Sequence, residues 1–190
     1  MLLGLALLTS FVGDMVGFIG GFILRMNMNT ESNILALIGL SITIWFYKTK
    51  IRIGTTGKAV SILAIVFILF GIVNLIFIQG HEKMNLYTLA FGAVSLILIS
   101  LVYFYLLIKE LPTESITRLP MFWINTAILI YYSGTFFQYL LTDYLINVLK
   151  GDIVNTWTIH NFLGFVFYVI VSVGLWLNRS LYLTTTAASV

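Results

Sequence analysis

Long apolar stretches separated by short polar segments dominate the chain. A membrane-spanning helix needs roughly 20 mostly apolar residues, and six stretches approach that length. We expect these spans at about 2–24, 31–47, 59–79, 86–108, 119–142 and 156–177. The pattern predicts an all-α fold, a polytopic integral membrane bundle of six transmembrane helices. We expect residues 1–179 to form a single domain and residues 180–190 to form a short, disordered cytoplasmic tail.

The composition agrees with a membrane location. Hydrophobic residues make up 60% of the 190 residues and charged residues 9%, whereas ordinary globular chains carry about a quarter charged residues. The net charge of +3 is explained by basic residues that set topology, so we expect the lipid bilayer, and not nucleic acid, as a partner. The absence of cysteine excludes disulfides, thiolate metal sites and a cysteine nucleophile.

The basic residues are distributed unevenly between the two predicted sides. Seven of the ten Lys and Arg fall on one side and three on the other. Because Lys and Arg near span ends are retained in the cytoplasm, we expect both termini inside and a multi-pass protein of the bacterial inner membrane. All four tryptophans lie within a few residues of a predicted span end, where indole rings prefer the membrane interface.

The first span contains a carboxylate. Asp14 lies near its middle, where a charge costs a few kcal/mol or more unless it is neutralised or paired. We interpret Asp14 either as a ligand, proton or ion site or as a protonated packing residue. Gly13, Gly17 and Gly21 form two overlapping G-x-x-x-G steps beside it, which favours helix packing or contact with a partner subunit.

The fifth span carries a polar stripe. Tyr131, Thr135, Gln138 and Thr142 recur at helical spacing, so their side chains share one helix face. Such a face does not favour lipid. The stripe therefore predicts an inward-facing position for these side chains.

Other polar residues are expected in the outer half of the bundle. Asn74 falls in the third span, and His160 and Asn161 fall in the sixth. Together with Asp14 and the stripe they predict a polar, ligand-binding cavity that opens to the outer face. An internal hydrogen-bond network that only specifies packing remains the alternative.

The sequence contains no catalytic or metal-binding signature. His81 and His160 do not form a ligand cluster. The segment around Ser133, with His160 on a later helix, invites comparison with rhomboid proteases, but Tyr131 replaces the first glycine of their motif and no pair of oxyanion residues is evident. We expect no catalytic residue, no metal, no cofactor and no enzymatic activity.

Residues 101–176 carry aromatic-rich helix patterns. These are Val102-Tyr103-Phe104-Tyr105 with Lys109-Glu110, Phe122-Trp123-Ile124-Asn125, Ile130-Tyr131-Tyr132-Ser133-Gly134-Thr135-Phe136-Phe137 and Trp157-Thr158-Ile159-His160-Asn161. This half of the chain resembles a group of poorly characterised polytopic membrane proteins of Bacteroidetes that look like sensor modules fused to, or encoded beside, histidine kinases. The resemblance implies a sensory or regulatory module. Because no kinase domain follows the sixth span, the signal would pass to a partner such as a kinase.

Two other functions remain open from the sequence. With six spans and small residues spaced by four on the first helix, the chain is similar to the substrate-binding subunits of energy-coupling-factor vitamin transporters. In that case Gly13, Gly17 and Gly21 would contact a coupling subunit, and the outer polar residues would bind the vitamin. A structural subunit of a membrane complex, or a homo-oligomer, is the third possibility.

Overall fold

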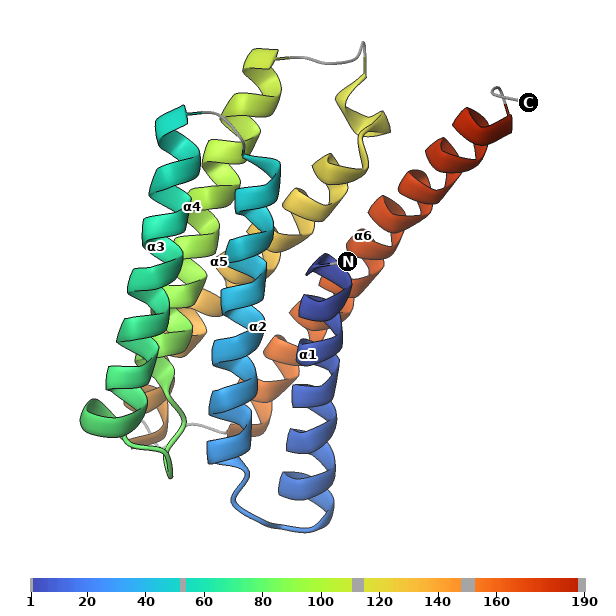
Figure 1. The fold of residues 1–190 in the computed structure, drawn as a ribbon. Helices are drawn as coiled ribbons and strands as arrows, with labels where there is room; N and C mark the ends of the chain where they lie inside the picture. The colour runs from blue at the N-terminus through green and yellow to red at the C-terminus, as the bar shows by residue number, and fades with distance from the viewer. Residues whose placement is uncertain (1, 52–53, 111–114, 148–152, 188–190) are drawn as a thin grey trace. The chain divides into compact units, whose positions relative to one another are not determined.

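The computed structural model describes residues 2–51, 54–110, 115–147 and 153–187 (Figure 1). These residues are helical apart from short connections, which confirms the all-α prediction. The elements in chain order are α1 (Leu2–Val16), the π-helix η1 (Gly17–Ile23), α2 (Asn29–Lys50), α3 (Gly54–Val73), the π-helix η2 (Asn74–Ile78), α4 (Leu86–Glu110), the 3₁₀-helix η3 (Ile116–Arg118), α5 (Pro120–Asn147) and α6 (Ile153–Ala187).

Four helical segments of the described chain are long and apolar enough to cross a membrane. They are Leu2–Gly20, Gly54–Ile78, Leu86–Glu110 and Thr158–Arg179. They indicate a multi-pass membrane protein whose apolar helices contact lipid. The helices α2 and α5 occupy the second and fifth predicted spans, and polar residues interrupt both.

The chain divides into two compact units. Unit 1 comprises Met1–Ser95 and unit 2 comprises Leu96–Val190. The division falls inside α4, so α4 contributes residues to both units. Each unit has buried apolar side chains of its own.

In unit 1, α1 packs against α2, and α2 packs against α3. Ile44, Tyr47 and Phe67 are fully buried. Gly92 permits a close approach, because a Cβ atom there would lie 2.8 Å from Leu40 Cδ1 and 3.1 Å from Phe67 Cε2. Burial of these large side chains therefore positions α4 against α2 and α3.

In unit 2, α5 and α6 cross and pack along much of their length (Figure 1). Asn125 on α5 is fully buried and donates a hydrogen bond from Nδ2 to the Ser100 carbonyl of α4, at 3.1 Å. Pro120 is the first residue of α5, a position where its missing N–H leaves no helical bond unmade. At Gly174 of α6, a Cβ atom would lie 2.9 Å from the Pro120 carbonyl oxygen.

Two details differ from the expected spans. The helix α6 continues through Ala187, past residue 180, where we expected a disordered tail to begin. The first and third spans end in the π-helices η1 and η2, which are rare and often occur at functional positions.

Candidate functional site

The structure brings His160 of α6 together with Tyr131 of α5. Tyr131 Oη and His160 Nε2 lie 3.3 Å apart, and the two ring centroids are 5.8 Å apart at an interplanar angle of 64°. Both side chains are half-buried. The hydrogen bond and the edge contact join two consecutive helices, α5 and α6.

Aromatic rings surround this pair. Tyr139 lies about two turns after Tyr131 on α5. The centroid of its ring lies 6.2 Å from that of the His160 ring, and the Tyr139 side chain is buried. The Phe167 ring of α6 lies 5.1 Å from the Tyr131 ring. The imidazole is therefore held between α5 and α6 in a largely apolar setting. We call His160, Tyr131 and Tyr139 the His160 cluster.

The polar stripe on α5 has a mixed outcome. Thr135 is fully buried, and Gln138 and Thr142 are half-buried. Thr135 Oγ1 donates to the Tyr131 carbonyl at 3.0 Å, and Thr142 Oγ1 donates to the Gln138 carbonyl. Both hydroxyls bond to carbonyl groups of their own helix, as threonines in helices often do. The stripe is thus turned away from the exposed face, but these two hydroxyls are used within α5.

Asn161 and Gly164 follow His160 on α6. Asn161 is exposed, whereas His160 is half-buried, so the two adjacent polar residues do not share one environment. A Cβ atom on Gly164 would meet nothing within 4 Å. A close approach between α5 and α6 occurs at Gly134 of α5, where a Cβ atom would lie 2.7 Å from Leu163 Cδ1.

Asp14 and the glycines of the first span lie in unit 1. Asp14 is exposed. A Cβ atom on Gly13 would be in ordinary contact with Leu35 of α2, at 3.8 Å, and one on Gly17 would meet nothing within 4 Å. Gly21 lies in η1, but its surroundings are outside the described residues. The tight contact in this region is made by Gly20, against Met28.

Asn74 belongs to a different polar set, also in unit 1. It is fully buried at the start of η2. Its Nδ2 donates to Gln79 Oε1 at 2.9 Å and to Thr88 Oγ1 at 2.8 Å. Gln79 Oε1 also accepts the Tyr87 backbone N–H at 3.0 Å, in the first turn of α4. Asn74 and Gln79 therefore join the end of η2 to the beginning of α4.

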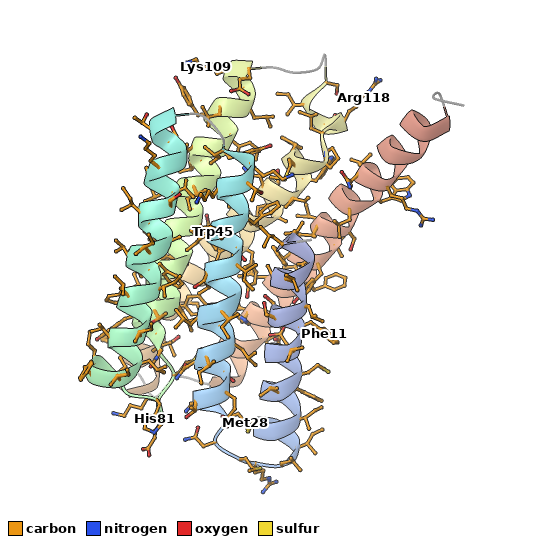
Figure 2. The ribbon with its side chains drawn as sticks, in the orientation of Figure 1. Phe11, Met28, Trp45, His81, Lys109 and Arg118 are labelled. Carbon is orange, nitrogen blue, oxygen red and sulfur yellow. The ribbon has the colours of Figure 1, made fainter. Side chains whose placement is uncertain are left out.

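Asparagines at the start of α2 hold the connection between η2 and α4. Asn33 is buried; its Nδ2 donates to the Lys83 carbonyl at 2.7 Å and to the His81 carbonyl at 3.4 Å. Its Oδ1 accepts the Asn85 N–H at 3.0 Å. Asn29 Nδ2 donates to the Glu82 carbonyl at 2.8 Å. Figure 2 shows His81 at the end of unit 1 where Met28 precedes α2.

Sequence reasoning missed this asparagine network. Within this network the sequence pattern predicts Asn74 alone as a site residue. It does not indicate its partners Gln79 and Thr88, or the pair Asn33 and Asn85. A signal was present, because asparagines cluster at the outer edges of the second to fourth predicted spans. Asparagine side chains commonly provide hydrogen-bond partners for the backbone N–H and C=O groups of a connection at a helix end.

We predict that Thr88→Val lowers the free energy of unfolding by about 1 kcal/mol. Valine keeps the shape of the buried side chain but removes the oxygen that accepts the Asn74 amide. Thermal unfolding in detergent, followed by circular dichroism, measures the change. Thr55→Val, at an exposed position in α3, is the control, and equal unfolding temperatures for both variants would contradict the prediction.

The polar residues predicted to line one cavity belong to both units. Asp14 and Asn74 lie in unit 1, and the His160 cluster lies in unit 2. Among the described residues there is no group of three or more His, Cys, Asp or Glu side chains that could hold a metal ion. The candidate chemistry is therefore the binding of a ligand through hydrogen-bonding and aromatic side chains on the helices.

Comparison of the chain with protein-family models, with curated proteins and with solved structures finds no match.

Proposed function

We propose that this chain is a sensory or regulatory module of a bacterial inner membrane that passes a signal to a partner protein and has no enzymatic activity. In this proposal all six helices span the bilayer with both termini in the cytoplasm, as the distribution of basic residues favours. The observation that carries the proposal is the contact between Tyr131 and His160, within the candidate span Thr158–Arg179. Ionisable residues inside a membrane mark functional sites by default.

Histidine can change its hydrogen bonding where most side chains cannot. A neutral imidazole has one donor and one acceptor nitrogen, while the protonated ring has two donors. An unperturbed imidazole changes its charge near neutral pH. Protonation of His160, or a ligand bonded to it, would alter the bond to Tyr131 and with it the contact between α5 and α6. The His160 cluster is the proposed sensing element.

The helix α6 provides a path from this element to the opposite end of unit 2. It is one continuous helix from Ile153 to Ala187, and its second close contact with α5 is the approach of Gly174 to Pro120. A shift of α6 at His160 would therefore move the region beside η3. Figure 2 shows Lys109 and Arg118 at this end of unit 2, where basic side chains are available to a partner.

Because the chain contains no cysteine, this movement can be measured with spin labels on introduced cysteines. We would label the exposed positions Leu140 on α5 and Phe162 on α6 in reconstituted protein. We expect the distance between the labels to change when the pH is lowered from about 8 to about 5, the range in which histidine titrates. The change should disappear in His160→Leu and weaken in Tyr131→Phe, which keeps the ring but lacks the hydroxyl.

The chain offers a matched control, because its only other histidine, His81, is exposed. His81→Leu should retain the response. An unchanged distance in the wild-type protein, or a response that survives in His160→Leu, would show that His160 is not the sensing element.

A second candidate is the substrate-binding subunit of a vitamin-type transporter. The observation that favours it concerns the end of α1 and the start of η1. Asp14 of α1 is exposed, and a Cβ atom on Gly17 of η1 would meet nothing within 4 Å, so a coupling subunit has access. Affinity purification from the native host in mild detergent separates the candidates. A co-purified kinase supports the sensor, ATPase subunits or a bound vitamin support the transporter, and a stable complex with neither supports a structural subunit.

A further inference from the structure

The end of unit 1 where α2 connects to α3 carries a cluster of lysines and aromatic rings. Lys48 and Lys50 lie in the last turn of α2, and Lys58 lies in the second turn of α3. Lys48 Nζ lies over the Trp45 ring, 4.0 Å from its centroid. Lys50 Nζ lies 5.7 Å from the centroid of the Phe46 ring. We call Lys48, Lys50 and Lys58, with Trp45, the lysine cluster.

The positive charge of this cluster has no acidic counterpart nearby in the sequence. Between Glu31 and Glu82 the chain contains no Asp or Glu. Lys48 and Lys50 interact favourably with the negative end of the α2 helix dipole. Lys58 lies near the positive end of the α3 dipole and gains no such interaction. Neither α3 nor the last turns of α2 therefore supplies a carboxylate to neutralise the three ammonium groups.

The lysine cluster lies at the boundary of the bilayer. The candidate membrane span of α3 begins at Gly54, after Lys48 and Lys50 and one turn before Lys58. Trp45 is exposed, as expected for an indole ring at the membrane interface. The groups at this depth of a bilayer are the phosphates and glycerol of phospholipids. Basic side chains at the ends of transmembrane helices bind anionic headgroups, each with about 1 kcal/mol near the surface.

We propose that the lysine cluster is a binding site for the headgroups of anionic phospholipids. The cation–π contact holds the Lys48 ammonium beside the indole ring, so part of the site is ordered before a lipid arrives. The lysines supply the charge, and Trp45 lies against the adjoining lipid. This inference concerns unit 1 and is independent of the proposed role of His160.

Trp45 is itself a reporter for the experiment. The variant W123F/W157F/W176F leaves Trp45 as the one tryptophan of the 190 residues. We would reconstitute the full chain in phosphatidylcholine vesicles and add phosphatidylglycerol or phosphatidylcholine with brominated acyl chains, which quench a tryptophan that they contact. The ratio of the two quenching constants gives the preference for the anionic headgroup. We expect brominated phosphatidylglycerol to quench Trp45 at a lower mole fraction, and the preference to fall at high salt, which screens exposed charges.

In the same background, K48Q/K50Q/K58Q removes the three ammonium groups. Since about 1 kcal/mol per lysine corresponds to about fivefold, we expect the preference to fall at least tenfold. The charge-matched control R25Q/K83Q/K109Q removes three positive charges elsewhere and should leave the preference unchanged. K48R/K50R/K58R should restore it.

Circular dichroism verifies that each variant keeps its helical content. Equal quenching by the two brominated lipids in the parent protein would overturn the proposal. An equal loss in the charge-matched control would also overturn it, because the preference would then follow net charge. Binding of a soluble acidic protein, with no lipid preference, would assign the lysine cluster to a protein partner and would likewise overturn the lipid site.

Discussion

Gly174→Ala is expected to lower the free energy of unfolding by about 1–3 kcal/mol, the usual cost of forcing an extra carbon into a packed contact. The added Cβ would lie 2.9 Å from the Pro120 carbonyl oxygen and 2.9 Å from Ile124 Cγ1. The first of these atoms belongs to the backbone at the start of α5, so it cannot rotate away as a side chain would. The helices must separate, and the α5–α6 contact weakens along its length.

A second glycine on α6 makes the control. Gly164 lies on the same helix, and a Cβ atom there would meet nothing within 4 Å. Gly164→Ala should therefore stabilise the protein by about 0.5–1 kcal/mol, because alanine is the better helix former. Thermal unfolding in detergent, followed by tryptophan fluorescence, gives the sign for both variants. Unfolding temperatures that move in the same direction would contradict the close approach at Gly174.

The second large effect is expected for Asn33→Ala. This change removes three hydrogen bonds to the connection between η2 and α4 and leaves the Asn85 N–H and the Lys83 carbonyl without their partner. Because the Asn33 side chain is buried, and each unsatisfied buried group costs about 1–3 kcal/mol, we expect a loss of about 2–4 kcal/mol. Thermal unfolding measures the total effect, and amide hydrogen exchange of the peptide 79–88 measures local opening.

Asn29→Ala is the matched control for this prediction. Asn29 Nδ2 makes a hydrogen bond to the neighbouring Glu82 carbonyl, but that bond is exposed, so water can replace the lost donor. We expect a loss below about 1 kcal/mol and little change in exchange at 79–88. Similar losses for Asn33→Ala and Asn29→Ala would show that burial does not decide the strength of this attachment.

The sequence predicts the helices well, because each depends on local information. Apolar runs locate all six, and Pro120 locates the beginning of α5. The spacing on α5 also places Tyr131 and Thr135 on one helix face, and the structure places Tyr131 beside His160. Helical periodicity carries this information, since it relates residues within one or two turns.

Contacts between distant segments were not predictable in the same way. The bonds of Asn33 to the connection before α4 join residues about fifty positions apart, and nothing in the local pattern at position 33 indicates them. The glycines show the same limit. The regular spacing on the first span predicts packing at Gly13 and Gly17, but a Cβ atom there would meet no close neighbour, whereas one on Gly92 or Gly174 would lie within 3 Å of another atom. The surface of the opposing helix decides which glycine is needed for close packing.

The hydrogen bonds that hold residues 81–83 require particular side chains on α2 but only backbone carbonyls at 81–83. Thr30, Asn33 and Asn29 bond to the carbonyl oxygens of residues 81–83, and any amino acid supplies a carbonyl. The side chains of residues 81–83 are exposed, so they are free to change in charge or size while the turn keeps its shape. This segment can acquire a new recognition surface, or accept an affinity label by substitution, without altering the helices that hold it.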